Sequence, residues 1–240
     1  MQSRNVVVAV TGASGSIYAI RLVSVLLDAD LTVHLIVSGA ARQVLQRELE
    51  TEFPVSGSPE ADWRSMMLQT VHGRVAQKWG FGTPTDSPSE VLTRGVLKIH
   101  GLGDYSAGIA SGSFLTAGMV ICPCSMGTLS AIATGASTNL IHRAADVHLK
   151  ERRPLVLVPR ESPLSVIQLE NMTRVSQAGG TVLPSMPGFY HQPQSIADLV
   201  DFVVARICDH LHVLHNLIQR WGESYPSGDP QVSDNSHNPK

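Results

Sequence analysis

The sequence has no long apolar run and no excess of charge of either sign. None of its apolar stretches approaches the roughly 20 residues that a membrane-spanning helix needs, and no apolar signal segment precedes the first strand-like run. Lysine and arginine number 18 against 20 aspartates and glutamates, which does not favour a polyanionic partner. We therefore expect a soluble, cytoplasmic protein that binds neither a membrane nor nucleic acid.

Cysteine is scarce, and its spacing does not suggest a metal site. The three cysteines are Cys122, Cys124 and Cys208. A zinc site prefers two to four residues between paired ligands and needs a second pair, so we expect reduced thiols in the core or in loops. The closely spaced histidines are His210, His212 and His215. Spacings of two and three do not place all of them on one helical face, so we expect no metal there.

The arrangement of apolar segments predicts an α/β fold. The chain is 43% hydrophobic, and its 240 residues suit a single domain. We expect strands at residues 5–10, 31–37, 119–122, 155–158 and 181–183, and helices at 17–27, 40–49, 129–133, 140–150, 164–178 and 196–211. This alternation predicts a Rossmann-like (flavodoxin-like), doubly wound parallel sheet. We expect the domain to span residues 1–222 and to be followed by a disordered tail at 223–240.

Between residues 52 and 104 the pattern is weak. Four prolines interrupt this stretch, Pro54, Pro59, Pro84 and Pro88. We expect loops there, with one short strand at residues 96–99.

Two short loops predict places where a phosphate can bind. Residues 11–16 (TGASGS) and 124–128 (CSMGT) each follow a strand-like run and open a helix-like run. Small residues let backbone N–H groups approach an anion, and the positive end of a helix favours negative charge. The alternative is that either loop is an ordinary turn with a helix cap.

The residue after the second strand bears on which nucleotide would bind. A dinucleotide site places an acidic residue there to bind the ribose hydroxyls, but this chain has Ser38. The sequence therefore disfavours NAD and favours a nucleotide with a terminal phosphate, such as flavin mononucleotide (FMN).

Two further segments carry candidate functional groups. Arg160 and Glu161 follow a buried strand and are a candidate anion clamp and general acid or base. Ser162 and Pro163 are also expected to cap and begin a helix. Tyr190 lies in a loop of glycine and proline, where it could bind a ligand or simply cover the core.

Four motifs together resemble the UbiX-type flavin prenyltransferases. They are TGASG at 11–15, VICPCS at 120–125, LVLVPRE at 155–161 with LENM at 169–172, and PGFY at 187–190. The likeness covers most of residues 5–222. It implies a Rossmann-like flavoprotein that joins the dimethylallyl group of dimethylallyl phosphate to N5 and C6 of reduced FMN. It also implies a dodecamer with sites at subunit junctions, no metal, and a product used by UbiD-type decarboxylases.

The resemblance also assigns roles to residues. Its FMN contacts correspond to Gly12, Ala13, Ser14, Ser38, Ser125, Met126, Gly127, Thr128 and Arg160. Its binders of the isoprenoid phosphate correspond to Lys150, Tyr190 and Arg206. Glu161 matches the acid and base, with Ser14, Glu48, Arg143 and Lys150 as further catalytic groups, and Tyr105 and Trp221 could form a π-rich wall around the allyl group. Without the resemblance, Arg143, Lys150 and Arg206 are ordinary solvated residues of amphipathic helices.

The sequence departs from the family pattern in two places, and two other functions compete. Residues 52–104 are longer and richer in proline and glycine than expected, and Tyr105 stands where a tryptophan is usual. Both bear on the fit of the isoprenoid.

An FMN-dependent cysteine decarboxylase is disfavoured because residues 128–131 (TLSA) contain no histidine. A flavin carrier without catalysis would not need Glu161 or Lys150. These two alternatives remain open at this stage.

Overall fold

The computed structural model describes residues 3–50, 54, 58–72, 79–81 and 94–220. All its described strands form one six-stranded parallel sheet in the order β3-β2-β1-β4-β5-β6. The strands are β1 (Asn5–Val10), β2 (Thr32–Val37), β3 (Val96–His100), β4 (Gly118–Cys124), β5 (Leu155–Pro159) and β6 (Thr181–Val182). This is the Rossmann strand order, and it reverses between β1 and β4. The predicted fold class is confirmed.

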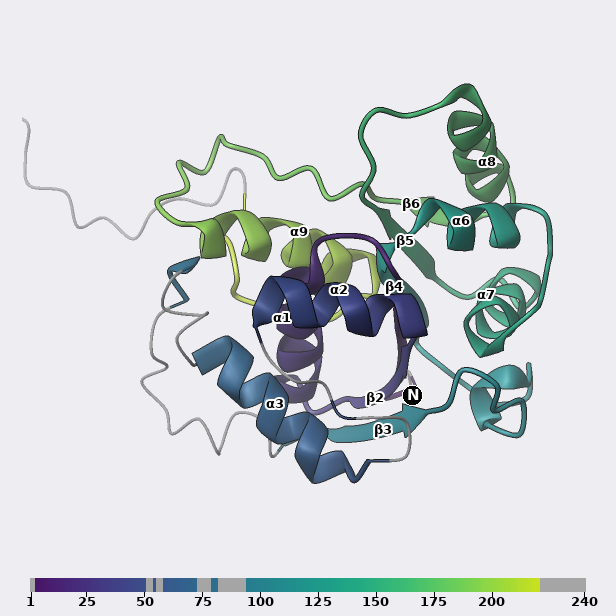
Figure 1. Ribbon diagram of the computed structural model, residues 1–240, viewed down its shortest axis with the longest axis horizontal. Helices are drawn as coiled ribbons and strands as arrows, with labels where there is room; N and C mark the ends of the chain where they lie inside the picture. Colours follow the sequence, from purple (N-terminus) through teal and green to yellow (C-terminus); the bar gives the residue numbers. More distant parts are fainter. Residues whose placement is uncertain (1–2, 51–53, 55–57, 73–78, 82–93, 221–240) are drawn as a thin grey trace, which may run out of the picture.

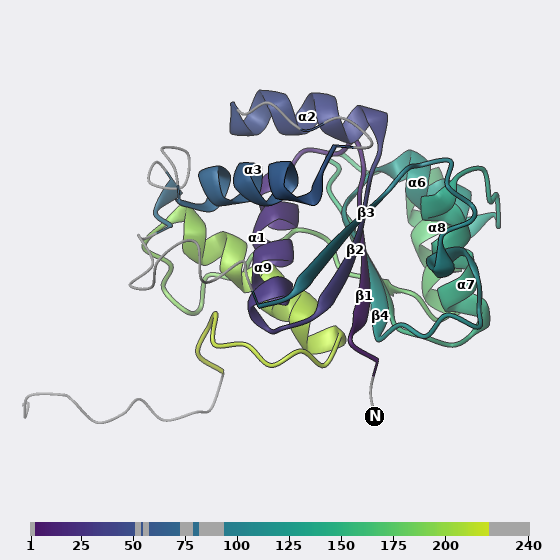
Figure 2. The ribbon, with the colours of Figure 1, turned by 90° about the horizontal axis from the view of Figure 1, so that it is seen from below.

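Helices cover both faces of the sheet (Figures 1 and 2). One face carries α1 (Ser16–Asp28), α3 (Glu60–His72) and α9 (Ile196–His210), with α2 (Gly39–Leu49) beside them. The other face carries α6 (Met126–Ala133), α7 (Leu140–Lys150) and α8 (Val166–Gln177), and the short 3₁₀ helix η1 (Gly108–Ala110) packs on α7. The sheet is therefore the middle layer of three.

The central strand β1 is buried on both sides because successive side chains point to opposite faces. Val6 and Val8 pack in the cluster that includes α1, α3 and α9. Val7 and Ala9 pack in the cluster that includes α6 and α7. A continuous apolar run is therefore the pattern that this position requires, and it explains why residues 5–10 were predicted correctly.

Helix α3 lies in the stretch that the sequence predicts to be loops, so that prediction was wrong for residues 60–72. Trp63, Met66, Met67 and Thr70 are all buried, at the spacing of one helical face. Glu60 and Asp62 in the first turn favour the helix dipole. The prolines at 54 and 59 precede this helix and do not interrupt it.

Helix α8 begins later than predicted. Its N-cap is Ser165, whose side chain accepts a hydrogen bond from the backbone of Gln168, while Gln168 reaches back to the backbone of Ser165. This capping box satisfies two terminal N–H groups, and Ser162 has no glutamine or glutamate three residues on. Ser162 and Pro163 therefore belong to the loop after β5.

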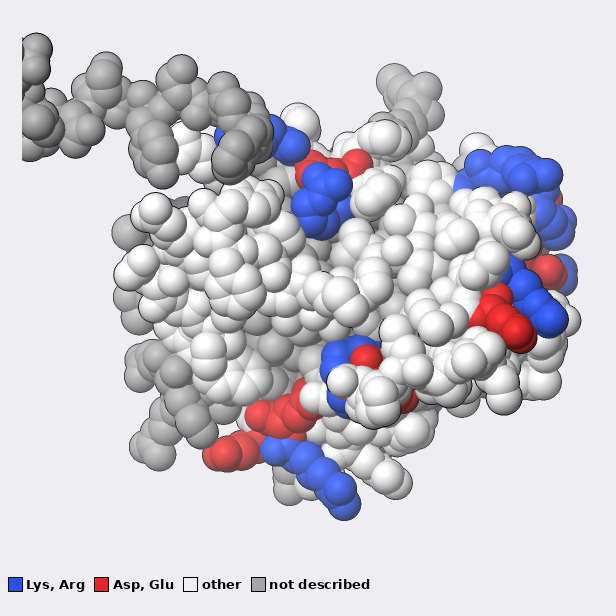
Figure 3. Space-filling model, turned by 90° about the horizontal axis from the view of Figure 1, so that it is seen from above, with Lys and Arg blue, Asp and Glu red and all other residues white. Residues whose placement is uncertain are grey.

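The cysteines are free and buried, at positions Cys122, Cys124 and Cys208. Within the described ranges, no group of three metal-ligating side chains could hold an ion, and no helix is long and apolar enough to cross a membrane. On the face drawn in Figure 3, basic side chains form several small groups, most of them beside acidic ones. The predicted tail at 223–240 lies outside the described residues.

Candidate functional site

The two predicted phosphate-binding loops, residues 11–16 and 124–128, are called the cradle loops, and they meet at the carboxyl edge of the sheet. β1 and β4 are neighbours, so the loops that follow them lie side by side where the strand order reverses. Gly12 approaches α2 so closely that a Cβ there would stand 2.6 Å from the Cβ of Ala40. Gly15 has a φ of 113°, in the left-handed region that favours glycine. Small residues are thus required in the first loop by its backbone.

The side chain of Glu48 lies at the N-terminus of α1, the helix that follows the first loop. Its carboxylate accepts hydrogen bonds from the backbone N–H of Gly15 at 3.1 Å and of Ser16 at 2.7 Å. Burial is the largest influence and raises the pKa of Glu48, but the hydrogen bonds from Ser14, Ser16 and Gly15 together hold it below its usual value. An ionised Glu48 therefore already neutralises the N-terminus of α1.

The second loop leaves its helix end available to an anion. Ser125 caps α6, because its side chain accepts from the backbone N–H of Thr128. The preceding N–H groups, those of Met126 and Gly127, have no intrahelical partner and no acceptor elsewhere in the described chain. A Cβ on Gly127 would meet nothing within 4 Å, so the space beside this helix end is open. An anionic group fits here better than at α1.

Ser38 lies at the end of β2, next to the first loop. Its side chain accepts from the backbone N–H of Ala41 and caps α2. Because a hydroxyl that accepts one bond can still donate another, this cap leaves Ser38 able to bind a ligand oxygen.

Arg160 and Glu161 follow β5 at the same edge. They line a cavity of about 220 Å³ that extends to Leu164, Met172 and the residues after β6. The Nε of Arg160 points its hydrogen to the carbonyl oxygen of Ser14 at 3.4 Å, which ties this segment to the first loop. Glu161 is exposed, and its Oε1 accepts from the backbone N–H of Ser162 at 3.2 Å. A cation and a carboxylate thus stand beside the cradles.

Tyr190 packs on helix α9, which also carries Arg206. The ring of Tyr190 contacts Phe202 edge to face, with 5.6 Å between centroids. Phe202 and Arg206 are four residues apart and so lie on one face of α9. Arg206 is exposed, and its Nη1 donates to Asp209 at 2.8 Å. Tyr190 is 55% exposed, so part of its side chain is open to solvent.

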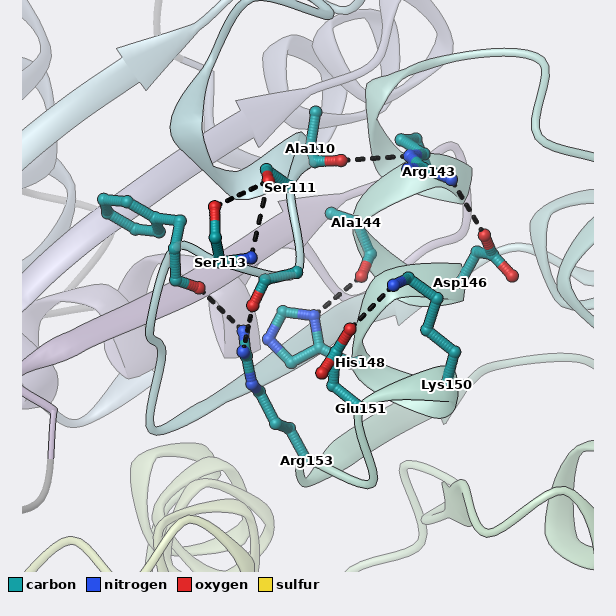
Figure 4. Close-up of polar contacts among 12 residues, drawn as sticks. Ala110, Ser111, Ser113, Arg143, Ala144, Asp146, His148, Lys150, Glu151 and Arg153 are labelled. Carbon is teal, nitrogen blue, oxygen red and sulfur yellow. Dashed lines mark hydrogen bonds and ion pairs between the residues drawn. The ribbon is translucent and has the colours of Figure 1, made fainter.

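Lys150 does not lie beside the cradles of its own chain. Arg143 donates from Nε to the carbonyl oxygen of Ala110 and from Nη1 to Asp146, and Lys150 pairs with Glu151 (Figure 4). Lys150 ends α7, which leads into the start of β5. In a parallel sheet that start is at the amino edge, opposite the cradles.

Of the two predicted wall residues, the structure describes only Tyr105. Tyr105 is 51% exposed in the loop after β3, between Asp104 and Ser106, which hydrogen-bond to each other. Trp221 lies outside the described residues.

The sequence alone gave no role to the side chain of Thr11, whose hydroxyl forms hydrogen bonds with both Pro123 and Ser125. A threonine directly after a buried strand, between apolar and glycine residues, was the available signal.

His148 is a buried histidine of α7, and its burial leads us to expect a loss of stability in acid. It is fully buried, its Nδ1 donates to the carbonyl oxygen of Ala144, and its Nε2 accepts from Thr116. Burial lowers the pKa of His148 to about 4. The unfolded chain therefore binds more protons between about pH 6.5 and 4, so stability falls as pH falls through that window.

We expect His148→Gln to reduce this pH dependence. Urea unfolding of the wild type and the variant at pH 7 and pH 4.5 measures the effect. The loss of unfolding free energy between these pH values should be smaller in His148→Gln by roughly 2 to 3 kcal/mol. Equal losses in the two proteins would show that His148 does not control it.

The doubly wound sheet and its paired loops define a nucleotide-binding α/β protein. A family model described as Flavoprotein matches residues 1–208. Flavin prenyltransferase UbiX of Pseudomonas aeruginosa is 47% identical over 220 residues, covering 92% of this chain and 95% of that protein. The UbiX of Alkalihalophilus pseudofirmus is 48% identical over 216 residues, covering 90% and 95%. The class is therefore that of the flavoproteins, which use FMN or a related flavin.

Two solved structures agree with this result. One, called AnUbiX and in complex with FMN and dimethylallyl pyrophosphate, has a TM-score of 0.73 and 33% identity, covering 93% of this chain and all of that one. The other, from Escherichia coli O157:H7, is described as a dodecameric FMN-dependent UbiX-like decarboxylase. It has a TM-score of 0.67 and 36% identity, covering 88% of this chain and 96% of that one. The chain belongs to the UbiX flavin prenyltransferase family.

Proposed function

We propose that this protein joins the dimethylallyl group of dimethylallyl phosphate to N5 and C6 of reduced FMN and so makes prenylated FMN. The observation that carries the proposal is the meeting, at one sheet edge, of an open helix end and the Arg160–Glu161 cavity. An anion site beside a cation and an acid suits a reaction that must bind one phosphate and expel another. Identities of 47% and 48% to named flavin prenyltransferases support the same reaction.

The two loops and their neighbours are the proposed FMN site. The set is Gly12, Ala13, Ser14, Ser38, Ser125, Met126, Gly127, Thr128 and Arg160. The open N–H groups at the start of α6 suit the FMN phosphate, because the first helix end is already neutralised by Glu48. Reduced FMN supplies the nucleophilic nitrogen N5 and the ring carbon C6. Arg160, tied to the first loop, closes the site from the side of β5.

Glu161 is the proposed acid and base. Breaking the C–O bond of the allylic phosphate separates charge, so Glu161 protonates the departing phosphate. The resulting carboxylate accepts the proton that N5 loses on bonding to carbon and gives it to the alkene of the transferred group. It then takes up the proton that C6 loses when C6 bonds to the tertiary carbon of that group. Ser14, Glu48 and Arg143 are proposed to assist these transfers. Glu48 does so by holding the backbone of the first loop.

The isoprenoid phosphate requires positive charge and hydroxyl donors. Lys150, Tyr190 and Arg206 are the proposed binders, since two cations stabilise the negative charge that grows on the leaving group. Tyr105 and Trp221 are the proposed walls of the allyl pocket, where a π face stabilises a developing allyl cation. Tyrosine at 105 in place of the usual tryptophan gives a smaller wall.

Lys150 can complete the site only if another copy of the chain provides it. Arg143 and Lys150 are seven residues apart on α7 and share one face of that helix. Exposed apolar side chains at Val166, Ile167 and Phe189 offer further surface for association. We propose a homo-oligomer, and specifically a dodecamer like the Escherichia coli relative.

The product and the location complete the proposal. Prenylated FMN would pass to a UbiD-type decarboxylase, because a modified flavin is useful only to an enzyme that binds it. The three buried free thiols are compatible with the reducing cytoplasm.

The function can be tested by the mass of the flavin. The purified protein is incubated without oxygen with reduced FMN and dimethylallyl phosphate, denatured, and the released flavin is weighed. We expect a product heavier than FMN by one dimethylallyl group. Unchanged FMN would contradict the proposal and would favour a flavin carrier or a decarboxylase. Recovery of FAD or NAD from the purified protein would contradict the FMN site itself.

A further inference from the structure

Thr11 connects the two cradle loops at the centre of the sheet. It follows β1 directly and is only 2% exposed. Its backbone N–H and its hydroxyl both donate to the carbonyl oxygen of Pro123, at 3.2 and 2.9 Å. The same hydroxyl accepts from the backbone N–H of Ser125 at 2.7 Å. One side chain therefore links residues that are more than a hundred positions apart in the sequence.

The same residue also shapes the backbone on both sides of the ligand site. Its carbonyl oxygen accepts from the N–H of Ala13 at 2.9 Å, which bends the first loop. On the other side, Ser125 is the N-cap of α6, so fixing its N–H fixes the direction in which that helix begins. The N–H groups of Met126 and Gly127 take their direction from this start.

We propose that Thr11 is a positioning residue for flavin binding: its hydroxyl holds the first loop against the start of α6, so that both loops face one ligand. The proposal rests on the FMN site proposed above and adds a residue that does not itself touch the flavin. It acts through Ser125. Without the hydroxyl, the half-buried N–H of Ser125 would lose its acceptor, or the two loops would move apart.

A purely structural threonine would behave differently, and the chain provides one for comparison. Thr116 is also buried, and its hydroxyl forms a hydrogen bond with His148 of α7 at 2.8 Å. It lies before β4, at the amino edge of the sheet. Thr116→Val therefore measures the cost of losing a buried threonine hydroxyl away from the cradles.

The test is FMN binding to the full-length protein without a prenyl donor. We expect Thr11→Val to raise the FMN dissociation constant about tenfold, the effect of roughly one lost hydrogen bond. Thr11→Ser keeps the hydroxyl and should stay within about twofold of the wild type. Thr116→Val should lower the melting temperature but leave FMN affinity within the same range. The flavin circular dichroism spectrum should change in Thr11→Val alone.

Three results would overturn the proposal. They are wild-type affinity in Thr11→Val, affinity in Thr11→Ser as weak as in Thr11→Val, and equal weakening of FMN binding by Thr116→Val. If Thr11→Val does not fold, Thr11→Cys replaces it, since a thiol is a weaker donor and acceptor, and an intermediate affinity is then expected. Because no prenyl donor is present, failure of prenyl transfer would leave this test unaffected.

Discussion

Replacing Glu161 by glutamine should slow prenyl transfer by about a hundredfold or more while leaving FMN bound, the loss typical of removing a general acid and base. Glutamine keeps the shape of the side chain and an oxygen that can accept the N–H of Ser162 at the position of Oε1. It cannot give a proton to the departing phosphate or take one from C6. Single-turnover conversion of reduced FMN under anaerobic conditions, followed by mass spectrometry, measures the rate.

The control for this variant is Glu170→Gln, because Glu170 is an exposed glutamate on α8 with no assigned role. It should convert FMN at the wild-type rate. Prenylated flavin made at that rate by Glu161→Gln would remove Glu161 from the mechanism. Loss of FMN binding in Glu161→Gln would instead mean that the carboxylate holds the site together.

The strands were predictable because burial on both faces of a parallel sheet demands unbroken apolar runs, as in residues 6–10 and 155–158. Helix α3 was missed because prolines, which favour loops, lie on both sides of residues 60–72, although Trp63, Met66 and Met67 have the spacing of one helical face. The start of α8 was misplaced because both Ser162 and Ser165 are suitable N-cap residues. Only Ser165 has a glutamine three residues later, which completes a capping box.

The site was predictable where its parts are local in sequence. Each cradle loop is a strand end followed by a helix start, and parallel strands bring such ends to one edge. Contacts between distant segments could not be derived in this way. The family resemblance named Glu48, but only the structure shows its carboxylate on the N–H groups of Gly15 and Ser16. The link from Thr11 to Ser125 had no sequence signal beyond a buried threonine.

The placement of Lys150 leads to the second large expected effect. Lys150→Met keeps the aliphatic stem and removes the positive charge, so we expect prenyl transfer to fall by about a hundredfold or more, as when a donor to the developing charge is lost. FMN binding should persist, because Lys150 is proposed to bind the isoprenoid phosphate and is not part of the proposed FMN site. The rate is measured as for Glu161→Gln.

If Lys150 acts in the site of another copy, two inactive variants should restore each other. Chains carrying Glu161→Gln and Lys150→Met are produced together with different tags, and oligomers that contain both are purified. With random assembly, about a quarter of the sites would combine an intact Glu161 with an intact Lys150 from a different chain, so activity should return to that fraction of the wild type. Oligomers that combine Lys150→Met with the double variant contain no Lys150 and should stay inactive. No recovery in the first mixture, or a monomer by light scattering in an active preparation, would place both residues in the site of a single chain and contradict the shared site.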